Sequence, residues 1–141
     1  MKKSTFFMWL GAFVVTVFTS IIWHAVLFEQ SYLKLGVFTR MNDPIYSFGV
    51  LAWLSEATAI TLLFLRSSWR SHGLVGALKL SFAANLYLAG STLMGTAAKV
   101  EISDLSLFFL LACGFLIVHS IAFGVWLHIC ENHLAITNRA R

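Results

Sequence analysis

The amino-acid sequence predicts an all-α membrane protein, a single domain (1–141) that folds as a bundle of four transmembrane helices. Hydrophobic residues make up 59% of the 141 positions and charged residues only 11%, whereas a soluble domain is usually about one quarter charged. One soluble core cannot hide so many apolar side chains, and the remainder would form exposed patches that drive association. We therefore expect the lipid bilayer to cover most of the surface.

Four stretches have the length and composition of a membrane span, which needs about 20 predominantly apolar residues. The first follows Lys2 and Lys3, as a signal peptide would, but its apolar run is longer than a usual h-region and no convincing small-x-small cleavage site follows it. We expect it to remain as an anchor helix. The four predicted spans are 4–28, 46–65, 74–98 and 105–129.

The connections favour an up-down-up-down bundle, because short loops join antiparallel neighbours. The longest loop, 29–44, mixes apolar and polar residues and holds the only proline, Pro44. This composition suits a segment that lies along the membrane interface. Small residues four apart let helices approach closely, and such pairs occur at Ser91/Gly95 and Ser120/Gly124.

The placement of lysine and arginine predicts the orientation, since these residues are enriched in cytoplasmic loops. Seven lie near one set of span ends and three near the other. Both termini are therefore expected in the cytoplasm. The cytoplasmic set is Lys2, Lys3, Arg66, Arg70, Lys79, Arg139 and Arg141, and the opposite set is Lys34, Arg40 and Lys99.

The basic balance and the two cysteines exclude several functional classes. The net charge of +4 falls in short clusters between apolar runs rather than in a stripe with interleaved aromatics, so we expect no nucleic-acid partner. Cys113 and Cys130 lie about 25 Å apart on one helix and cannot form a disulfide within one chain. No Cys/His cluster has zinc-site spacing, and no metal or cofactor is expected.

Four polar side chains form a candidate site at the bilayer midplane, the midplane set. An ionisable side chain inside a span costs roughly 2.5 to 3.5 kcal/mol at the centre, so each such residue is a functional hypothesis. Glu56 lies about midway along the second span, Asn85 reaches a similar depth in the third, and His119 lies about one turn from the midpoint of the fourth. Thr16, near the centre of the first span, is a possible fourth member.

Two interpretations of the midplane set stay open. In the functional one, Glu56 exchanges a proton with His119 while Asn85 orients one of them. In the structural one, the same residues form a hydrogen-bonded staple that sets helix register.

The five histidines do not predict a haem site. At 1.5 Å per residue, His24 lies about 11 Å outward of the midplane, His119 about 3 Å inward and His128 about 16 Å inward. No two share a depth within one molecule. No nucleophilic triad, P-loop or GxGxxG motif supports an enzyme.

A loose motif runs through Trp23-His24, Phe28, Tyr32, Arg40, Asp43-Pro44 and Gly49, and ends at Ala97-Ala98-Lys99. In these residues the chain resembles uncharacterised small bacterial four-helix integral membrane proteins. The resemblance implies an inner-membrane location and carries no activity. If the motif marks a site, that site is an outer-face set, distinct from the midplane set, made of Trp23, His24, Tyr32, Arg40 and Asp43.

The sequence favours one function and leaves a second open. A small helical chain without a soluble domain suits an accessory or assembly subunit of a larger membrane complex or a homo-oligomer. The alternative is a small proton-coupled transporter or channel-like protein that uses the midplane set. A membrane enzyme ranks last, since no motif names its reaction.

Overall fold

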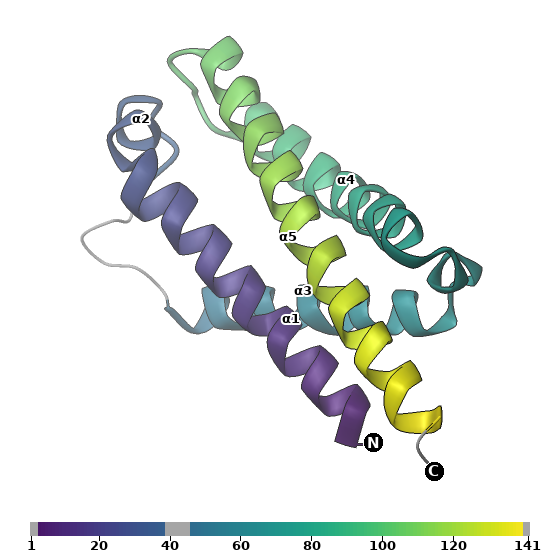
Figure 1. The fold of residues 1–141 in the computed structure, drawn as a ribbon. Coiled ribbons are helices and arrows are strands. Elements are labelled where there is room, and N and C mark those ends of the chain that lie inside the picture. Colours follow the sequence, from purple (N-terminus) through teal and green to yellow (C-terminus); the bar gives the residue numbers. More distant parts are fainter. Residues whose placement is uncertain (1–2, 39–45, 140–141) are drawn as a thin grey trace.

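The computed structural model describes residues 3–38 and 46–139, and in these ranges the chain is helical with no β-strand (Figure 1). The all-α prediction is therefore confirmed. In chain order the elements are α1 (Lys3–Ile21), the π-helical turn η1 (Ile22–Leu27), α2 (Glu29–Lys34), α3 (Tyr46–Arg66), the 3-10 turn η2 (Ser68–His72), α4 (Gly73–Lys99) and α5 (Leu105–Arg139).

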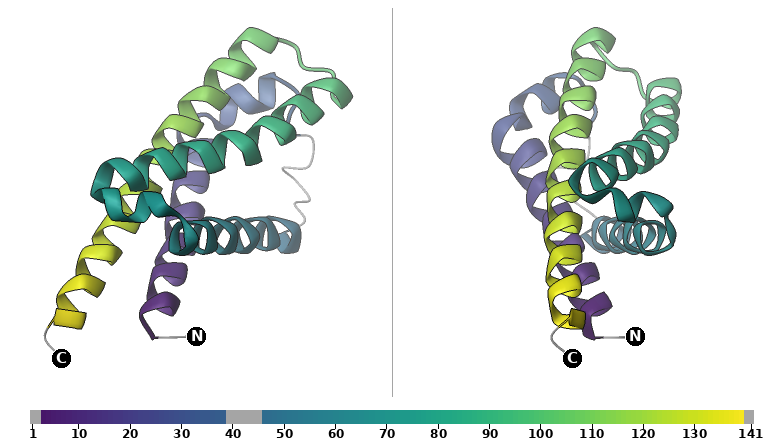
Figure 2. Two further views of the ribbon diagram at one scale, coloured as in Figure 1. Left: turned by 90° about the vertical axis from the view of Figure 1, so that its right-hand side faces the viewer. Right: turned by 45° about the vertical axis from the view of Figure 1, so that its right-hand side comes forward.

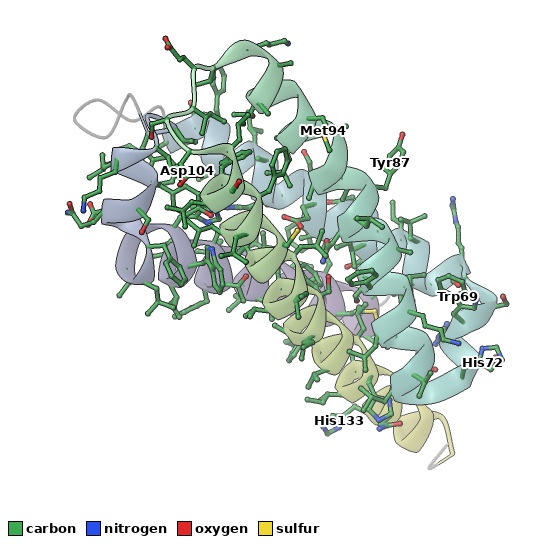
Figure 3. All side chains as sticks on the ribbon, turned by 90° about the horizontal axis from the view of Figure 1, so that it is seen from above. Trp69, His72, Tyr87, Met94, Asp104 and His133 are labelled. Atoms are coloured by element: carbon green, nitrogen blue, oxygen red, sulfur yellow. The ribbon has the colours of Figure 1, made fainter. Side chains whose placement is uncertain are left out.

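Four helical segments are long and apolar enough to cross a membrane, as predicted. They are Ser4–Leu27, Tyr46–Arg66, Ser68–Lys99 and Leu105–His133. The largest difference is at the last one, because α5 continues to Arg139 where the predicted span ends at residue 129. On α4, Tyr87 and Met94 point outward from the other helices (Figure 3), as side chains that face lipid do.

Three of the long helices pack in the expected antiparallel manner. Helix α5 runs antiparallel to both α1 and α4, and α1 begins at the end of the molecule where α5 finishes (Figures 1 and 2). Helix α3 differs, since it crosses α1 at a steep angle instead of lying alongside it (Figure 2). The described chain is therefore a three-helix antiparallel core with α3 laid across it.

The core lies where α1, α4 and α5 meet the C-terminal half of α3. Phe123 and Leu127 of α5 are fully buried there beside Met8 and Ala12 of α1 and Phe64 of α3. Two indoles add hydrogen bonds between helices: Trp126 Nε1 donates to the Met8 carbonyl at 3.0 Å, and Trp9 Nε1 donates to Thr58 Oγ1 at 2.9 Å.

Helix α3 presents a different face to the core than its small residues suggest. Gly49, Ala52, Ala59 and Leu63 flank Glu56 at helical spacing and would suit close packing in a bundle interior, but the buried residues are Ala57, Ile60, Thr61 and Phe64. The N-terminal half of α3 has no buried residue, and Tyr46, Phe48 and Leu51 are exposed. Since this half diverges from the core, Glu56 borders open space between α3 and its neighbours.

The two predicted small-residue pairs behave differently. Gly124 lies against Leu78 of α4, where a β-carbon would come within 2.9 Å of the Leu78 Cα, so this glycine is required for the close approach of α4 and α5. Ser120, one turn earlier, is buried in the same interface. Gly95, in contrast, has no neighbouring atom within 4 Å of a β-carbon.

At the opposite end, α2 closes the molecule with a second apolar cluster. Tyr32 and Leu35 are buried there with Phe108 and Leu111. The α4–α5 connection is attached to this end, because Ser103 Oγ donates to the Lys34 carbonyl at 2.8 Å. Part of loop 29–44 thus folds into a helix that packs on the bundle. Arg40 and Asp43 of the predicted outer-face set lie outside the described residues.

Candidate functional site

His119 and Glu56 form a direct contact, as their depths predicted. His119 Nε2 lies 2.9 Å from Glu56 Oε1. The imidazole is buried, stacked on Phe115 of the same helix with 4.8 Å between ring centroids, and it meets Phe123 edge-on at 4.9 Å. Its second nitrogen, Nδ1, lies 2.5 Å from Thr19 Oγ1 of α1. The ring is therefore held from three helices.

The hydrogen bonds around His119 define where a proton resides. Thr19 Oγ1 donates to the Val15 carbonyl at 2.7 Å, and a hydroxyl has only one proton to give, so it then accepts from Nδ1–H. In that arrangement one proton lies between His119 Nε2 and Glu56 Oε1, either as carboxylic acid and imidazole or as carboxylate and imidazolium. The pair is neutral in both forms.

Losing one proton leaves a net negative charge. From the imidazolium–carboxylate form, the Nδ1 proton departs; Thr19 then rotates its hydroxyl to donate to Nδ1, and Nε2–H donates to the Glu56 carboxylate. The Val15 carbonyl already belongs to the α1 helix ladder, so the rotation leaves no buried group without a partner. The Glu56/His119 pair is thus built to hold or release one proton.

The other two members of the midplane set have different partners from those expected. The Asn85 amide donates to Ser120 Oγ at 3.1 Å and is not hydrogen-bonded to Glu56 or His119. Its carbonyl oxygen Oδ1 is buried without a partner. Thr16 is buried and donates to the Ala12 carbonyl at 3.0 Å, so the threonine that contacts His119 is Thr19, one turn further along.

A cavity of about 530 Å³ extends from the Glu56/His119 pair toward α2. The polar residues on its wall are His24, Tyr32, Ser55, Glu56, Asn85, Thr92, Thr96 and His119. The remaining wall is aliphatic and aromatic. We expected the outer-face and midplane sets to be distinct sites, but His24 and Tyr32 from the first set line the same cavity as Glu56, Asn85 and His119.

The π-helical turn η1 explains how Trp23 and His24 both face inward although they are adjacent in sequence, because a π turn is wider than an α turn. The Trp23 ring packs on Phe28 at 4.6 Å between centroids, and its Nε1 donates to the Tyr32 hydroxyl at 3.3 Å. His24 packs on Tyr32 at 4.9 Å and on Phe115 at 4.6 Å. Phe115 therefore contacts both His24 and His119. The two histidines share this neighbour although they lie at different depths in the bundle.

The chain was compared with known protein families, with curated proteins and with solved structures. None of these comparisons gives a match. Within residues 3–38 and 46–139, no three His, Cys, Asp or Glu side chains converge as metal ligands.

The cavity brings together three kinds of group that suit a ligand site. It has an acid/imidazole pair that exchanges a proton, an unpaired buried acceptor at Asn85 Oδ1, and a mostly apolar wall. Ligand pockets generally combine an apolar lining with a few convergent polar groups. A buried acceptor without a partner costs about 1–3 kcal/mol, which a ligand donor would recover.

Tyr32 makes the α2 end of the cavity sensitive to alkali. Burial raises the pKa of its hydroxyl above the ordinary value of about 10, and the hydrogen bond from Trp23 offsets part of that rise. The folded state therefore holds this proton more tightly than the unfolded chain. We expect stability to fall as pH rises above about 10, and the fall to be smaller in Tyr32→Phe. Melting temperatures in detergent check this, and an identical alkaline loss in both chains would contradict it.

Proposed function

We propose that this chain is a small proton-coupled membrane transport protein in which the Glu56/His119 pair carries the proton. The observation that supports this most directly is the 2.9 Å contact between His119 Nε2 and Glu56 Oε1 on the wall of a 530 Å³ cavity. If the contact served only to set the register of the helices, no cavity would be needed beside it. The cavity therefore favours the functional interpretation over the structural one.

Proton binding and ligand binding are coupled because a charge is costly in an apolar setting. The protonated pair is neutral, whereas the deprotonated pair carries a charge that costs several kcal/mol inside a membrane unless a ligand compensates it. Proton and ligand occupancy are then linked, since each changes the free energy of the other. Imidazole suits the role because its ordinary charge change lies between about pH 5 and pH 8.

The four apolar helices fit a multi-pass membrane protein. We further propose that the membrane is a bacterial inner membrane and that both termini are cytoplasmic. The distribution of lysine and arginine supports this orientation, as does the location of the α1 start and the α5 end at one end of the molecule (Figure 1). The resemblance to small bacterial membrane proteins supports the location.

The test is proton movement in vesicles that contain the purified chain and a trapped pH-sensitive dye. Amines, carboxylic acids, sugars and divalent cations are added outside, one class at a time. We expect one class to change the internal pH about tenfold or more faster with the wild-type chain than with Glu56→Gln. Ser71→Ala is the matched control, because Ser71 lies outside the cavity and its hydroxyl donates to the Ser68 carbonyl of its own turn.

Glu56→Gln keeps the size of the side chain and an oxygen near His119, so folding is expected to survive the change. Its melting temperature is measured on the same preparation. If no class of solute moves protons faster with the wild type than with Glu56→Gln, while both chains are folded, the transport proposal is wrong.

The second candidate function is the accessory or assembly subunit, and one observation favours it. Gly95 of α4 has open space within 4 Å of a β-carbon position, and Ser91, one turn earlier, is exposed, so a helix from another chain has room to approach this face closely. This candidate expects copurified partners or a stable homo-oligomer in mild detergent. A native mass equal to one chain, without partners, would count against it.

A further inference from the structure

We propose that the cavity binds a protonated amine attached to an apolar body, and that binding of this cation displaces the proton of the Glu56/His119 pair. This inference rests on the proposed function and names its substrate class. The ligand chemistry follows from the hydrogen-bond acceptors, the charge and the rings that line the cavity.

Two of the polar groups that line the cavity offer free acceptors. Asn85 Oδ1 is buried without a partner, while the Asn85 amide is already committed to Ser120. Glu56 Oε1 contacts His119, which leaves the second carboxylate oxygen for a further donor. Two acceptors on residues that line the same cavity suit a group with at least two N–H donors, and an alkylammonium has three.

The charge of the cavity selects a cation over a neutral donor. Among the described residues, neither lysine nor arginine lines it, so no described side chain on the wall compensates the deprotonated pair with a fixed positive charge. The titratable side chains that face this space with Glu56 are His24 from η1, Tyr32 from α2 and His119 from α5. A neutral hydroxyl would leave the negative charge uncompensated, whereas an ammonium cancels it.

The rest of the lining suits an apolar body that bears the amine. Tyr32, Phe38, Phe108 and Phe115 contribute aromatic rings. Ring faces attract a cation within about 6 Å and pack well against flat or branched hydrocarbon. The divergence of the N-terminal half of α3 gives such a molecule a route between α3 and α4, where Ala52, Ala89 and Thr92 line the cavity.

The binding step conserves atoms and charge. The neutral pair holds one proton between His119 Nε2 and Glu56 Oε1. When the ammonium binds, the pair is in its imidazolium–carboxylate form, the Nδ1 proton leaves to water, and the carboxylate remains as the acceptor for the ammonium. One positive charge enters and one leaves, and His119 keeps its remaining ring proton on Nε2, with Thr19 donating to Nδ1.

The probe is phenylbutylamine, with phenylbutanol as a neutral match of the same length and ring. Binding to the purified full chain in mild detergent is measured by calorimetry, and proton release is read with a pH dye in weak buffer. We expect the amine to bind about tenfold or more tightly than the alcohol and to release close to one proton per molecule. Glu56→Gln is expected to bind the amine about tenfold or more weakly and to release no proton, while Ser71→Ala, outside the cavity, behaves as the wild type.

Two results would overturn the inference. Equal binding of the amine and the alcohol would show that the cavity does not select a charged ligand. Amine binding without proton release would show that the ligand does not displace the proton of the Glu56/His119 pair. If the amine does not bind as expected but another solute class drives Glu56-dependent proton movement in vesicles, the proposed substrate class is wrong and the proposed transport function stands. If no class drives it, both are wrong.

Discussion

Replacement of His119 by alanine is expected to lower the free energy of unfolding by about 3–5 kcal/mol, comparable to the truncation of a buried aromatic ring, because it also removes two hydrogen-bond contacts. The substitution empties the space between Phe115 and Phe123 and removes the hydrogen-bond partners of Glu56 and Thr19. Since a small domain is stable by only about 5–15 kcal/mol, the loss is a large fraction of the total. Thermal unfolding in mild detergent measures it.

A double-mutant cycle separates the contact with Glu56 from the packing of the ring. Glu56→Gln, His119→Ala and the double variant are compared, and groups in contact show a coupling free energy of about 0.5–3 kcal/mol. We expect a coupling in that range for the Glu56/His119 contact. Additive effects of the two changes, or unchanged melting of His119→Ala, would mean that the pair contributes nothing to the fold.

Phe123→Ala is expected to have a comparable effect, about 3–5 kcal/mol, through packing alone. Phe123 is fully buried where α1, α3, α4 and α5 meet, and its ring edge supports His119. Truncation removes apolar contacts from four helices at once and leaves a cavity that rigid helices cannot close. The measurement is the free energy of unfolding in detergent with added lipid.

Phe7→Ala is the matched control for this change. Phe7 lies on α1 and is 65% exposed, so in a membrane it contacts lipid, which is as apolar as the side chain. We expect its replacement to change stability by about 0.5 kcal/mol or less. Equal losses from Phe7→Ala and Phe123→Ala would contradict the assignment of the core.

Local composition was sufficient to predict the helices of this fold. Apolar runs of about 20 residues were recognisable without knowledge of any neighbour, because the need to satisfy the backbone inside lipid leaves few alternatives to a helix. The predicted starts of α3 and α5, at Tyr46 and Leu105, agree with the structure. The end of α5 was placed too early because the polar turn after residue 129 ends the apolar run but not the helix.

The candidate site was predicted in part. The depth of each residue along its span correctly predicted that Glu56 and His119 lie at a similar level, since the rise per residue is constant in a helix. Depth does not give the rotation of a helix about its axis, so it selected Thr16 where Thr19 makes the contact, and it joined Asn85 to Glu56 where Asn85 binds Ser120. Thr19 had one available signal, because it lies one turn from Thr16 on the same side of α1.

By itself, the sequence determined that this chain is helical, which four segments have the length and apolarity to cross a membrane, and which polar residues lie deep within them. Only the tertiary structure decided that α3 crosses the other helices, that its Glu56 face borders a cavity, and that His24 and His119 meet through Phe115. The reason is physical. Apolar length and depth are properties of one segment, whereas the rotation and crossing of helices depend on the packing of side chains from several segments at once.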